Sequence, residues 1–97
     1  MKIELKKFGN ILISRQAGRE ALAALQSSLK PMSPDENVEV DFEGVITFSP
    51  SWGDEFLSPL KKQFGDKFVL TNIANNPSVI ESLKIIERAI GVSFNVA

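Results

Sequence analysis

The 97-residue sequence contains no cysteine and no histidine. Without cysteine the chain has no disulfide bond and no thiolate nucleophile, and without either residue type the usual structural zinc sites are excluded. Every catalytic triad that needs an imidazole base is excluded as well. Most of the chemistry that small enzymes use is therefore missing, and we expect a protein that is not an enzyme and needs neither a cofactor nor a metal.

A long hydrophobic run and a strong charge of one sign are also lacking. No stretch approaches the roughly 18 apolar residues of a membrane span, and the first residues lack the apolar block of a signal peptide. Lysine and arginine number 11 and aspartate and glutamate 12, giving a net charge of −1 with both signs mixed along the chain. Such a chain has no field that attracts nucleic acid or an anionic membrane. We expect a cytoplasmic protein that binds no nucleic acid and no membrane.

The apolar residues that are present suffice for one small core. They make up 43% of the chain and include seven phenylalanines and one tryptophan. A chain of this length has no room for a second core. We therefore expect residues 1–97 to form a single domain.

Four segments have strand-like patterns. Lys2–Phe8 is predicted to be a half-exposed strand, Phe68–Leu70 a buried strand, and Val92–Val96 a weaker edge strand. The fourth, Val38–Phe42, alternates strictly and places Glu39 and Asp41 on the face opposite its three apolar residues. Because strands covered on both faces are usually apolar throughout, this alternation favours helices mainly on one face of the sheet. The other face is then free to meet water or a partner.

Three helices are expected between these strands. The first is capped by Ser14, is ended by Pro31 and Pro34, and has an apolar stripe of Gly18, Leu22, Leu25 and Leu29. The second has a stripe of Trp52, Phe56, Leu60 and Phe64, and Pro59 predicts either a kink or a stop and restart with Ser58 as the new cap. The third begins at Asn76-Pro77, ends at Gly91, and faces inward with Val79, Ile80, Leu83, Ile86 and Ile90.

This alternation of strands and helices predicts an α/β fold. We expect a sheet of about four strands, mostly parallel or mixed, and three main helices chiefly on one face. The directions of the first and last strands remain open at this point.

The most informative stretch runs from Val40 to Phe56, where a strand passes through a turn to a helix start. In open α/β sheets, ligands and partners bind at this carboxyl end of a strand. Ser51 is predicted to cap the helix, with Asp54 completing a reciprocal pair three residues later. A second interpretation makes Ser51 a phosphate acceptor, since a phosphate there meets free amides but adds roughly two negative charges beside Asp54 and Glu55.

Other side chains near this stretch allow alternatives. Trp52 is either the first residue of the core stripe or an aromatic anchor exposed for a partner, and we favour the core. Asp41 and Asp54 could form a carboxylate pair, although a strand-face aspartate and a helix-cap aspartate need no catalytic role. Arg15 and Arg19, one helical turn apart, form either a solvated face or an anion-binding pair.

The stretch resembles the core of the STAS fold (sulphate transporter and anti-sigma factor antagonist), and more specifically the bacterial STAS-like domains of unknown function. The residues that carry the resemblance are Asp41-Phe42-Glu43-Gly44-Val45, then Ser49-Pro50-Ser51-Trp52 and Asp54-Glu55, with Ser14-Arg15 before the first helix. By order of elements the similarity covers most of the chain.

The resemblance implies a non-enzymatic regulatory module that binds a protein partner, which in the anti-sigma antagonists is a serine kinase. Ser51 falls where those proteins carry the phosphorylated serine. Their usual turn is Asp-Ser-Ser-Gly, whereas Ser49, Pro50, Ser51 and Trp52 occupy the four places here. This chain therefore lacks the aspartate of that turn.

The leading hypothesis is a regulatory interaction module of the anti-sigma antagonist type, with Ser49, Ser51, Trp52, Asp54, Glu55 and Asp41 as candidate phosphorylation or partner-binding residues. The expected partner is a protein, in particular a histidine-kinase-like ATPase acting as a serine kinase. The alternative is a structural domain, monomer or homodimer, that self-associates through its exposed sheet face or Val92–Val96. A third hypothesis, an enzyme with Ser51 as nucleophile, lacks an identifiable base.

Overall fold

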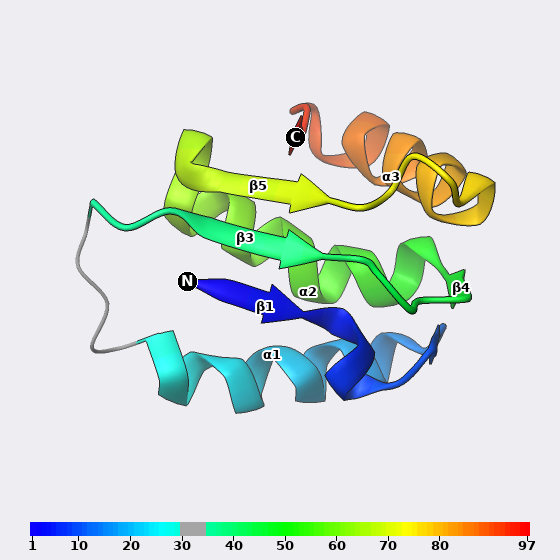
Figure 1. Ribbon diagram of the computed structural model, residues 1–97, viewed down its shortest axis with the longest axis horizontal. Helices are drawn as coiled ribbons and strands as arrows, with labels where there is room; N and C mark the ends of the chain where they lie inside the picture. The colour runs from blue at the N-terminus through cyan, green and yellow to red at the C-terminus, as the bar shows by residue number, and fades with distance from the viewer. Residues whose placement is uncertain (30–34) are drawn as a thin grey trace.

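A computed structural model describes residues 1–29 and 35–97 of the chain, and it has two layers, a sheet and a set of helices (Figure 1). The central sheet has four strands in the order β1-β3-β5-β6, and every neighbouring pair runs parallel. The strands span Lys2–Glu4 for β1, Val38–Asp41 for β3, Phe68–Thr71 for β5 and Asn95–Val96 for β6. The first and last strands thus share the direction of the others.

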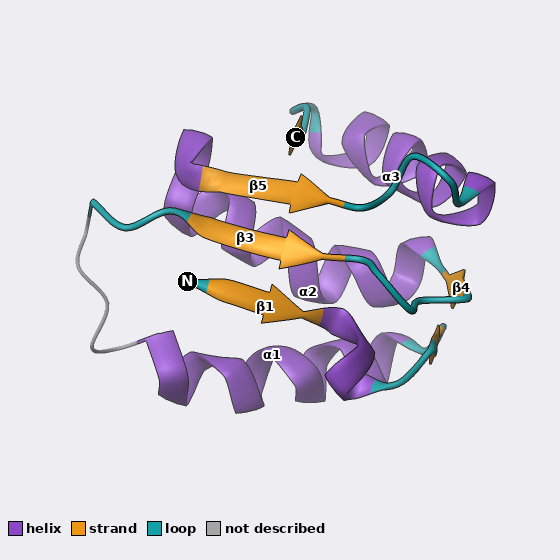
Figure 2. Ribbon diagram, viewed as in Figure 1, coloured by secondary structure: helices purple, strands orange, loops and turns teal. Residues whose placement is uncertain are grey.

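Three helices lie together on one face of this sheet (Figure 2). They span Arg15–Leu29 for α1, Pro50–Phe64 for α2 and Pro77–Ile90 for α3. The core fills the space between the layers and includes the fully buried side chains of Val40, Phe48, Trp52, Phe56 and Phe68. The predicted α/β fold, with four strands and helices on one face, is confirmed.

A second, smaller sheet lies at the carboxyl end of the central strands (Figure 1). It consists of β2, Ile11–Leu12, and β4, Thr47–Phe48, which run parallel. The backbone amides of Ile46 and Thr47 both donate to the carbonyl of Asn10, at 2.8 and 3.1 Å. This small sheet delivers the chain to the start of α2.

The first predicted strand is shorter than the sequence pattern indicated. Strand β1 ends at Glu4, and Leu5–Phe8 forms a single 3-10 turn, η1. In a 3-10 helix residues i and i+3 share one side, so Leu5 and Phe8 both face the core while the two lysines between them are exposed. A short 3-10 turn and a strand end therefore produce the same apolar spacing.

The predicted cap and stripe of α1 are confirmed where the chain is described. The backbone amide of Ala17 donates to Ser14 Oγ at 3.0 Å. A Cβ atom at Gly18 would lie 2.5 Å from the carbonyl oxygen of Trp52, so glycine permits the close approach of α1 to α2 at this point. The side chain of Leu29, together with Pro31 and Pro34, lies outside the described residues.

Helix α2 continues through Pro59 without a break. Ser58 does not cap a new helix, because its hydroxyl donates to Asp54 Oδ1 at 2.9 Å within the same helix. The predicted stop and restart is therefore wrong. Phe56 and Leu60, on either side of Pro59, are completely buried, and this packing outweighs the hydrogen bond that the proline removes.

Helix α3 begins and ends where the sequence predicted. Asn76 Oδ1 accepts from the backbone amide of Val79 at 3.2 Å, and Pro77 occupies the first turn. Gly91 ends the helix in the left-handed conformation, with a φ of 74°. The last strand is confirmed at the edge of the sheet, but it covers only Asn95–Val96 of the predicted five residues.

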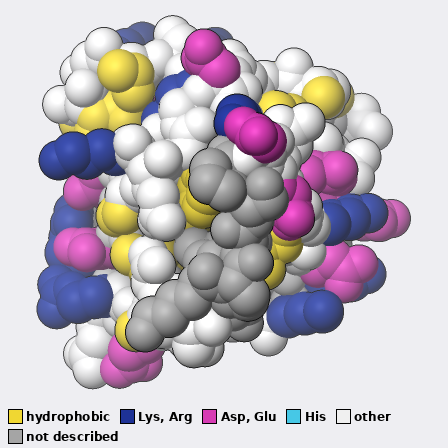
Figure 3. Space-filling model, turned by 90° about the vertical axis from the view of Figure 1, so that its left-hand side faces the viewer, with side chains coloured by type: hydrophobic (Ala, Val, Ile, Leu, Met, Phe, Trp, Pro, Cys, Tyr) yellow, Lys and Arg dark blue, Asp and Glu magenta, His cyan; other side chains and the backbone are white. Residues whose placement is uncertain are grey.

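The surface carries charged side chains of both signs. At the end of the molecule where β3 begins, lysine and arginine are interspersed with aspartate and glutamate (Figure 3). Among the three helices as far as the structure describes them, none has both the length and the apolar character needed to cross a membrane.

Candidate functional site

Ser49, rather than Ser51, caps helix α2. Its backbone is extended, and its Oγ accepts from the amide of Trp52 at 3.3 Å. The same Oγ donates to the carbonyl of Ile13 at 2.7 Å, so the cap also ties α2 to the end of β2. The prediction that Ser51 is the cap is wrong because Pro50 takes the first helical position, and the cap is the residue before it.

Ser51 lies one residue after Pro50, inside the first turn of α2, and is half-buried. Within residues 1–29 and 35–97 its hydroxyl has no hydrogen-bond partner. The predicted reciprocal pair with Asp54 does not form, since Asp54 Oδ1 accepts from Ser58 and Oδ2 from Arg15. The Ser51 hydroxyl therefore has no structural role in capping.

Trp52 belongs to the core, as favoured from the sequence, and is only 1% exposed. Its ring stacks on Phe56, with centroids 4.8 Å apart, and meets the ring of Phe48 edge-on at 5.9 Å. The alternative of a surface anchor is thereby wrong. Gly53 packs just as tightly, because a Cβ atom there would lie 2.5 Å from Phe48 Cζ and from Ile86 Cδ1.

The acidic residues of α2 are paired with arginines of α1. Arg15 Nη1 donates to Asp54 Oδ2 at 3.1 Å and to Glu55 Oε1 at 2.9 Å, and Arg19 lies 3.6 Å from the same Glu55 oxygen. The two arginines thus form neither a purely solvated face nor a free anion site. They hold the first turns of α1 and α2 together on the surface.

This pairing shifts the titration of the groups involved. The hydrogen bond from Arg15 is the main cause that lowers the pKa of Glu55 below its ordinary value of 4.5, and Arg19 adds to it. In return, hydrogen bonding to Glu55 and then to Asp54 raises the pKa of Arg15. Glu55 therefore keeps its negative charge to lower pH in the folded protein than in the unfolded chain.

Asp41, predicted on the open face of its strand, is 2% exposed and lies apart from this cluster. Its Oδ1 accepts from Asn72 Nδ2 at 2.6 Å and from the backbone amide of Glu43 at 2.9 Å, and Lys2 Nζ lies 3.5 Å from Oδ2. Asp41 and Asp54 share no partner, so they do not form a carboxylate pair. The role of Asp41 is to join the ends of β3 and β5 to β1.

The environment of Asp41 keeps it ionised. Burial on its own would raise the pKa of this carboxyl group, but hydrogen bonds from Asn72 and the Glu43 amide, together with the charge of Lys2, lower the pKa below its ordinary value of 3.8. A buried carboxylate with a full set of donors is a structural element. Nor do acidic side chains in the described parts of the chain gather in threes to hold a metal ion.

Three exposed isoleucines lie beside the start of α2. Ile11, Ile13 and Ile46 are 59%, 52% and 61% exposed, and we call them the isoleucine patch. They lie on and next to the β2–β4 sheet, and the carbonyl of Ile13 accepts the hydrogen bond from Ser49. Large apolar side chains exposed on and beside one small sheet are common at protein-binding surfaces.

Comparison with known protein families matches residues 22–77 to the family described as STAS-like domain of unknown function (DUF4325). The chain belongs to this family. The matched residues of this STAS-like domain run from the middle of α1 to the first residue of α3 and include all of α2. Neither the curated proteins nor the solved structures contain a match to the chain.

Two features of the site were not recognised from the sequence. The capping role of Ser49 could have been found, because Pro50 marks the first helical position by the same rule that placed Asn76 before Pro77. The pairing of Arg15 with Asp54 and Glu55 left no local signal, since 39 positions separate Arg15 from Asp54.

Proposed function

We propose that this STAS-like domain is a non-enzymatic regulatory module of the anti-sigma factor antagonist type, acting in the cytoplasm by binding a protein partner at the start of α2. The observation that carries the proposal is the half-buried hydroxyl of Ser51, which has no hydrogen-bond partner in the described residues while Ser49 does the capping. A hydroxyl without a structural task is available for modification by the partner.

The surroundings of Ser51 suit a phosphate switch. Asp54 and Glu55, three and four residues later on the same helix, lie on the same face as Ser51. A phosphate on Ser51 would gain from the positive end of the helix dipole, but it would repel both carboxylates and compete with them for Arg15. Modification would thus change the charge and the pairing of this surface together.

The isoleucine patch supports a protein as the partner. Ile13 lies next to the cap of α2, since its carbonyl accepts from Ser49, and Ile11 and Ile46 lie on and beside the same small sheet, so one docking protein could reach both these side chains and Ser51. A partner that phosphorylates Ser51 must bring ATP, and a histidine-kinase-like ATPase acting as a serine kinase fits this requirement. The γ-phosphoryl group would pass to Ser51 Oγ, with release of ADP and of the hydroxyl proton.

The test mixes the purified domain with a histidine-kinase-like ATPase from the same genome and ATP. We expect the mass gain of one phosphoryl group, located on Ser51 by peptide mapping. Ser78 is a matched control, because it follows Pro77 in α3 as Ser51 follows Pro50 in α2, and it is exposed. Ser51→Ala should abolish the gain and Ser78→Ala should leave it unchanged.

Stability measurements separate this role from a structural one. Since Ser51 is not the cap, the free energy of unfolding of Ser51→Ala should lie within about 0.5 kcal/mol of that of the unmodified domain. Ser51→Asp should also fold and should weaken docking if negative charge is the signal. The proposal would be wrong if Ser51→Ala were still phosphorylated. It would also be wrong if no such ATPase of the genome either phosphorylated or bound the domain.

A second candidate function is self-association. The edge strand β6 is short, both its residues are exposed, and Val96 is 54% exposed. An exposed strand edge is able to pair with a second copy. Sedimentation at high protein concentration decides this, because a dimer that Val96→Asp dissociates supports self-association and a strict monomer excludes it.

A further inference from the structure

One side-chain nitrogen of α1 reaches across the outward face of the first turns of α2. Arg15 Nη1 donates both to Asp54 Oδ2 at 3.1 Å and to Glu55 Oε1 at 2.9 Å. Each residue of an α-helix is turned by about 100° from the one before it, so Asp54 and Glu55 lie about 60° to one side and about 40° to the other side of Ser51. A nitrogen that bonds both carboxylates therefore lies over the line along which Ser51 projects.

The direction of the side chains along the helix brings this nitrogen toward Ser51. Side chains of an α-helix are tilted toward its amino terminus, so the carboxylate of Glu55 is directed back over the turn that contains Ser51. On the other side, Asp54 Oδ1 accepts from Ser58 Oγ at 2.9 Å, which leaves Oδ2 for Arg15. The guanidinium of Arg15 thus lies above α2 between Ser51, one turn earlier, and Ser58, one turn later.

Arg15 and Arg19, which we call the arginine pair, project from a helix that is fixed against α2. At Gly18 the two helices approach so closely that a Cβ atom would lie 2.5 Å from the carbonyl oxygen of Trp52. Arg19 Nη2 lies 3.6 Å from the same Glu55 oxygen that Arg15 bonds. The arginine side chains are 48% and 64% exposed, so their long chains are free to turn to a new partner without moving either helix.

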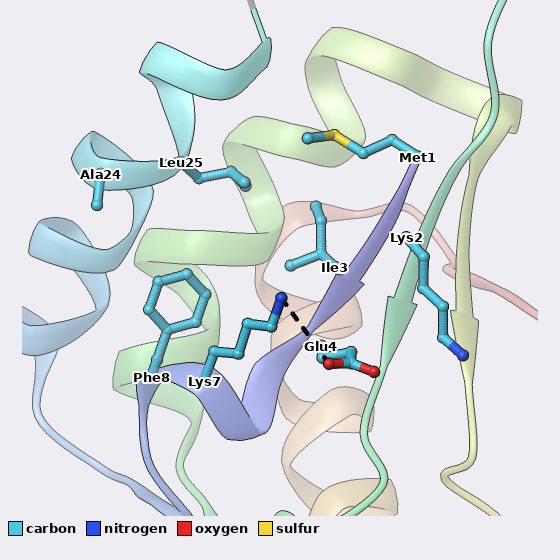
Figure 4. A pocket seen from close by; sticks show the side chains of 8 residues that line it. All are labelled: Met1, Lys2, Ile3, Glu4, Lys7, Phe8, Ala24 and Leu25. Carbon is cyan, nitrogen blue, oxygen red and sulfur yellow. Dashed lines mark ion pairs between the residues drawn. The ribbon is translucent and has the colours of Figure 1, made fainter.

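The lysines at the start of the chain are engaged with other carboxylates. Figure 4 shows two of them beside the groove between β1 and α1, a hollow of about 240 Å³. Lys7 reaches across to Glu4, with 3.9 Å between Nζ and Oε2. Lys2 points away from α1, and its Nζ lies 3.5 Å from Asp41 Oδ2. In the described parts of the chain, the acidic residues of α2 have ion pairs only with the arginine pair.

We propose that the arginine pair binds the phosphate when Ser51 is phosphorylated, and that Asp54 and Glu55 are released from it. The inference rests on the proposed phosphorylation of Ser51 and says how that modification is read. A phosphate has about two negative charges and three acceptor oxygens, so it binds a guanidinium more strongly than a carboxylate does. The start of α2 then changes from two arginines balanced by two carboxylates to a surface with a net charge of about −2, on which the two carboxylates are unpaired.

The test places phosphoserine at position 51 during translation, so that no kinase is needed, and titrates the phosphate by ³¹P NMR. The matched control carries phosphoserine at Ser78, which has the same place in the first turn of α3 and has Glu81 three residues later. Two neighbouring carboxylates alone would make the phosphate at Ser51 bind its second proton more tightly than the phosphate at Ser78. With the arginine pair bound to it, the phosphate at Ser51 should instead bind that proton about threefold or more weakly.

Variants and a second titration identify the arginines as the cause. Arg15→Ala should remove most of the difference between the two phosphates, and the double variant with Arg19→Ala should remove all of it, whereas Arg88→Ala should leave it unchanged. Arg15→Lys should retain part of it, since lysine keeps the charge but not the planar fork. In ¹³C NMR of the side-chain carboxyl groups, the pKa of Glu55, which Arg15 lowers in the unmodified domain, should rise when Ser51 carries the phosphate.

Three results would overturn the proposal. One is a phosphate at Ser51 that binds its second proton as tightly as the phosphate at Ser78, or more tightly. Another is a difference that persists in the double arginine variant, folded by circular dichroism, because the helix dipole would then be its cause. The third is a Glu55 pKa that stays low after phosphorylation. A kinase that fails to modify Ser51 would refute the phosphate switch but change none of these measurements, so the two proposals fail separately.

Discussion

Helices α2 and α3 begin with the same local pattern but lie in different surroundings. Ser49–Trp52 and Asn76–Val79 each consist of a capping residue, a proline, a serine and a buried apolar residue. Both caps also bond a distant carbonyl, that of Ile13 for Ser49 and that of Val45 for Asn76. Local sequence thus sets where a helix begins.

What differs is the environment of the turn that follows. At the start of α2, Arg15 bridges Asp54 and Glu55, and the isoleucine patch lies alongside. At the start of α3, the matching serine, Ser78, is exposed and Glu81 takes the place of Asp54 without an ion pair among the described residues. A serine in the first turn of a helix therefore becomes a candidate site through its neighbours in space.

The largest expected effect is at Gly53, which follows the four-residue pattern in α2, and it is compared with Ile80, which follows the pattern in α3. Gly53→Val should lower the free energy of unfolding by about 3 kcal/mol, because a Cβ atom there meets Phe48 and Ile86 at 2.5 Å. Ile80→Val should cost about 1 kcal/mol. Urea unfolding measures both, and a Gly53→Val protein as stable as Ile80→Val would show that the two helix starts are packed alike.

The two caps should have smaller and similar effects. Ser49→Ala and Asn76→Ala each remove one bond to a helix amide and one to a distant carbonyl. We expect each to lose about 1 to 2 kcal/mol of unfolding free energy in urea. If Ser49→Ala were neutral and Ser51→Ala costly, the assignment of the cap to Ser49 would be wrong.

The smallest effect should be that of the surface ion pairs, and it should depend on pH. Arg15 lowers the pKa of Glu55, so the stability that the pair contributes is present above the ordinary value of 4.5 and is lost as the pH falls through the lowered pKa. Arg15→Ala should therefore be less stable than the unmodified domain at pH 7 and equal to it in strong acid.

Thermal unfolding at several pH values tests this dependence. Arg88→Ala in α3 is the control, because Arg88 has no ion pair within the described residues and its removal should shift stability equally at every pH. A constant gap between Arg15→Ala and the unmodified domain from pH 7 into strong acid would mean that Glu55 does not depend on Arg15. Salt should reduce the gap at pH 7, since both groups are partly exposed.

Much of the fold could be predicted because its signals are local. The alternation of Val38–Phe42 indicated a sheet with helices on one face, and Asn76-Pro77 and Gly91 marked both ends of α3. The length of the first strand was overestimated, because the apolar spacing of Leu5 and Phe8 suits a 3-10 turn as well as a strand. Such ambiguity is inherent in short patterns.

The candidate site was predicted only in part. The stretch around Ser51 was recognised, and Trp52 was placed in the core. Asp41 was expected on an open face, yet it is buried, because the donors that cover it come from Lys2 on β1 and from Asn72 after β5. Strand alternation shows which face a side chain occupies, but it does not show what lies over that face.

By itself the sequence determined the α/β alternation, the membership of the STAS-like family and the ends of α3, since these rest on hydrogen bonds and apolar periods within a few residues. Only the tertiary structure decided that Arg15 pairs with the two carboxylates at the start of α2, that Asp41 is buried, and that a groove lies between β1 and α1. Each of these depends on groups about 20 to 40 positions apart, which are brought together by the packing of the helices on the sheet and not by local propensity.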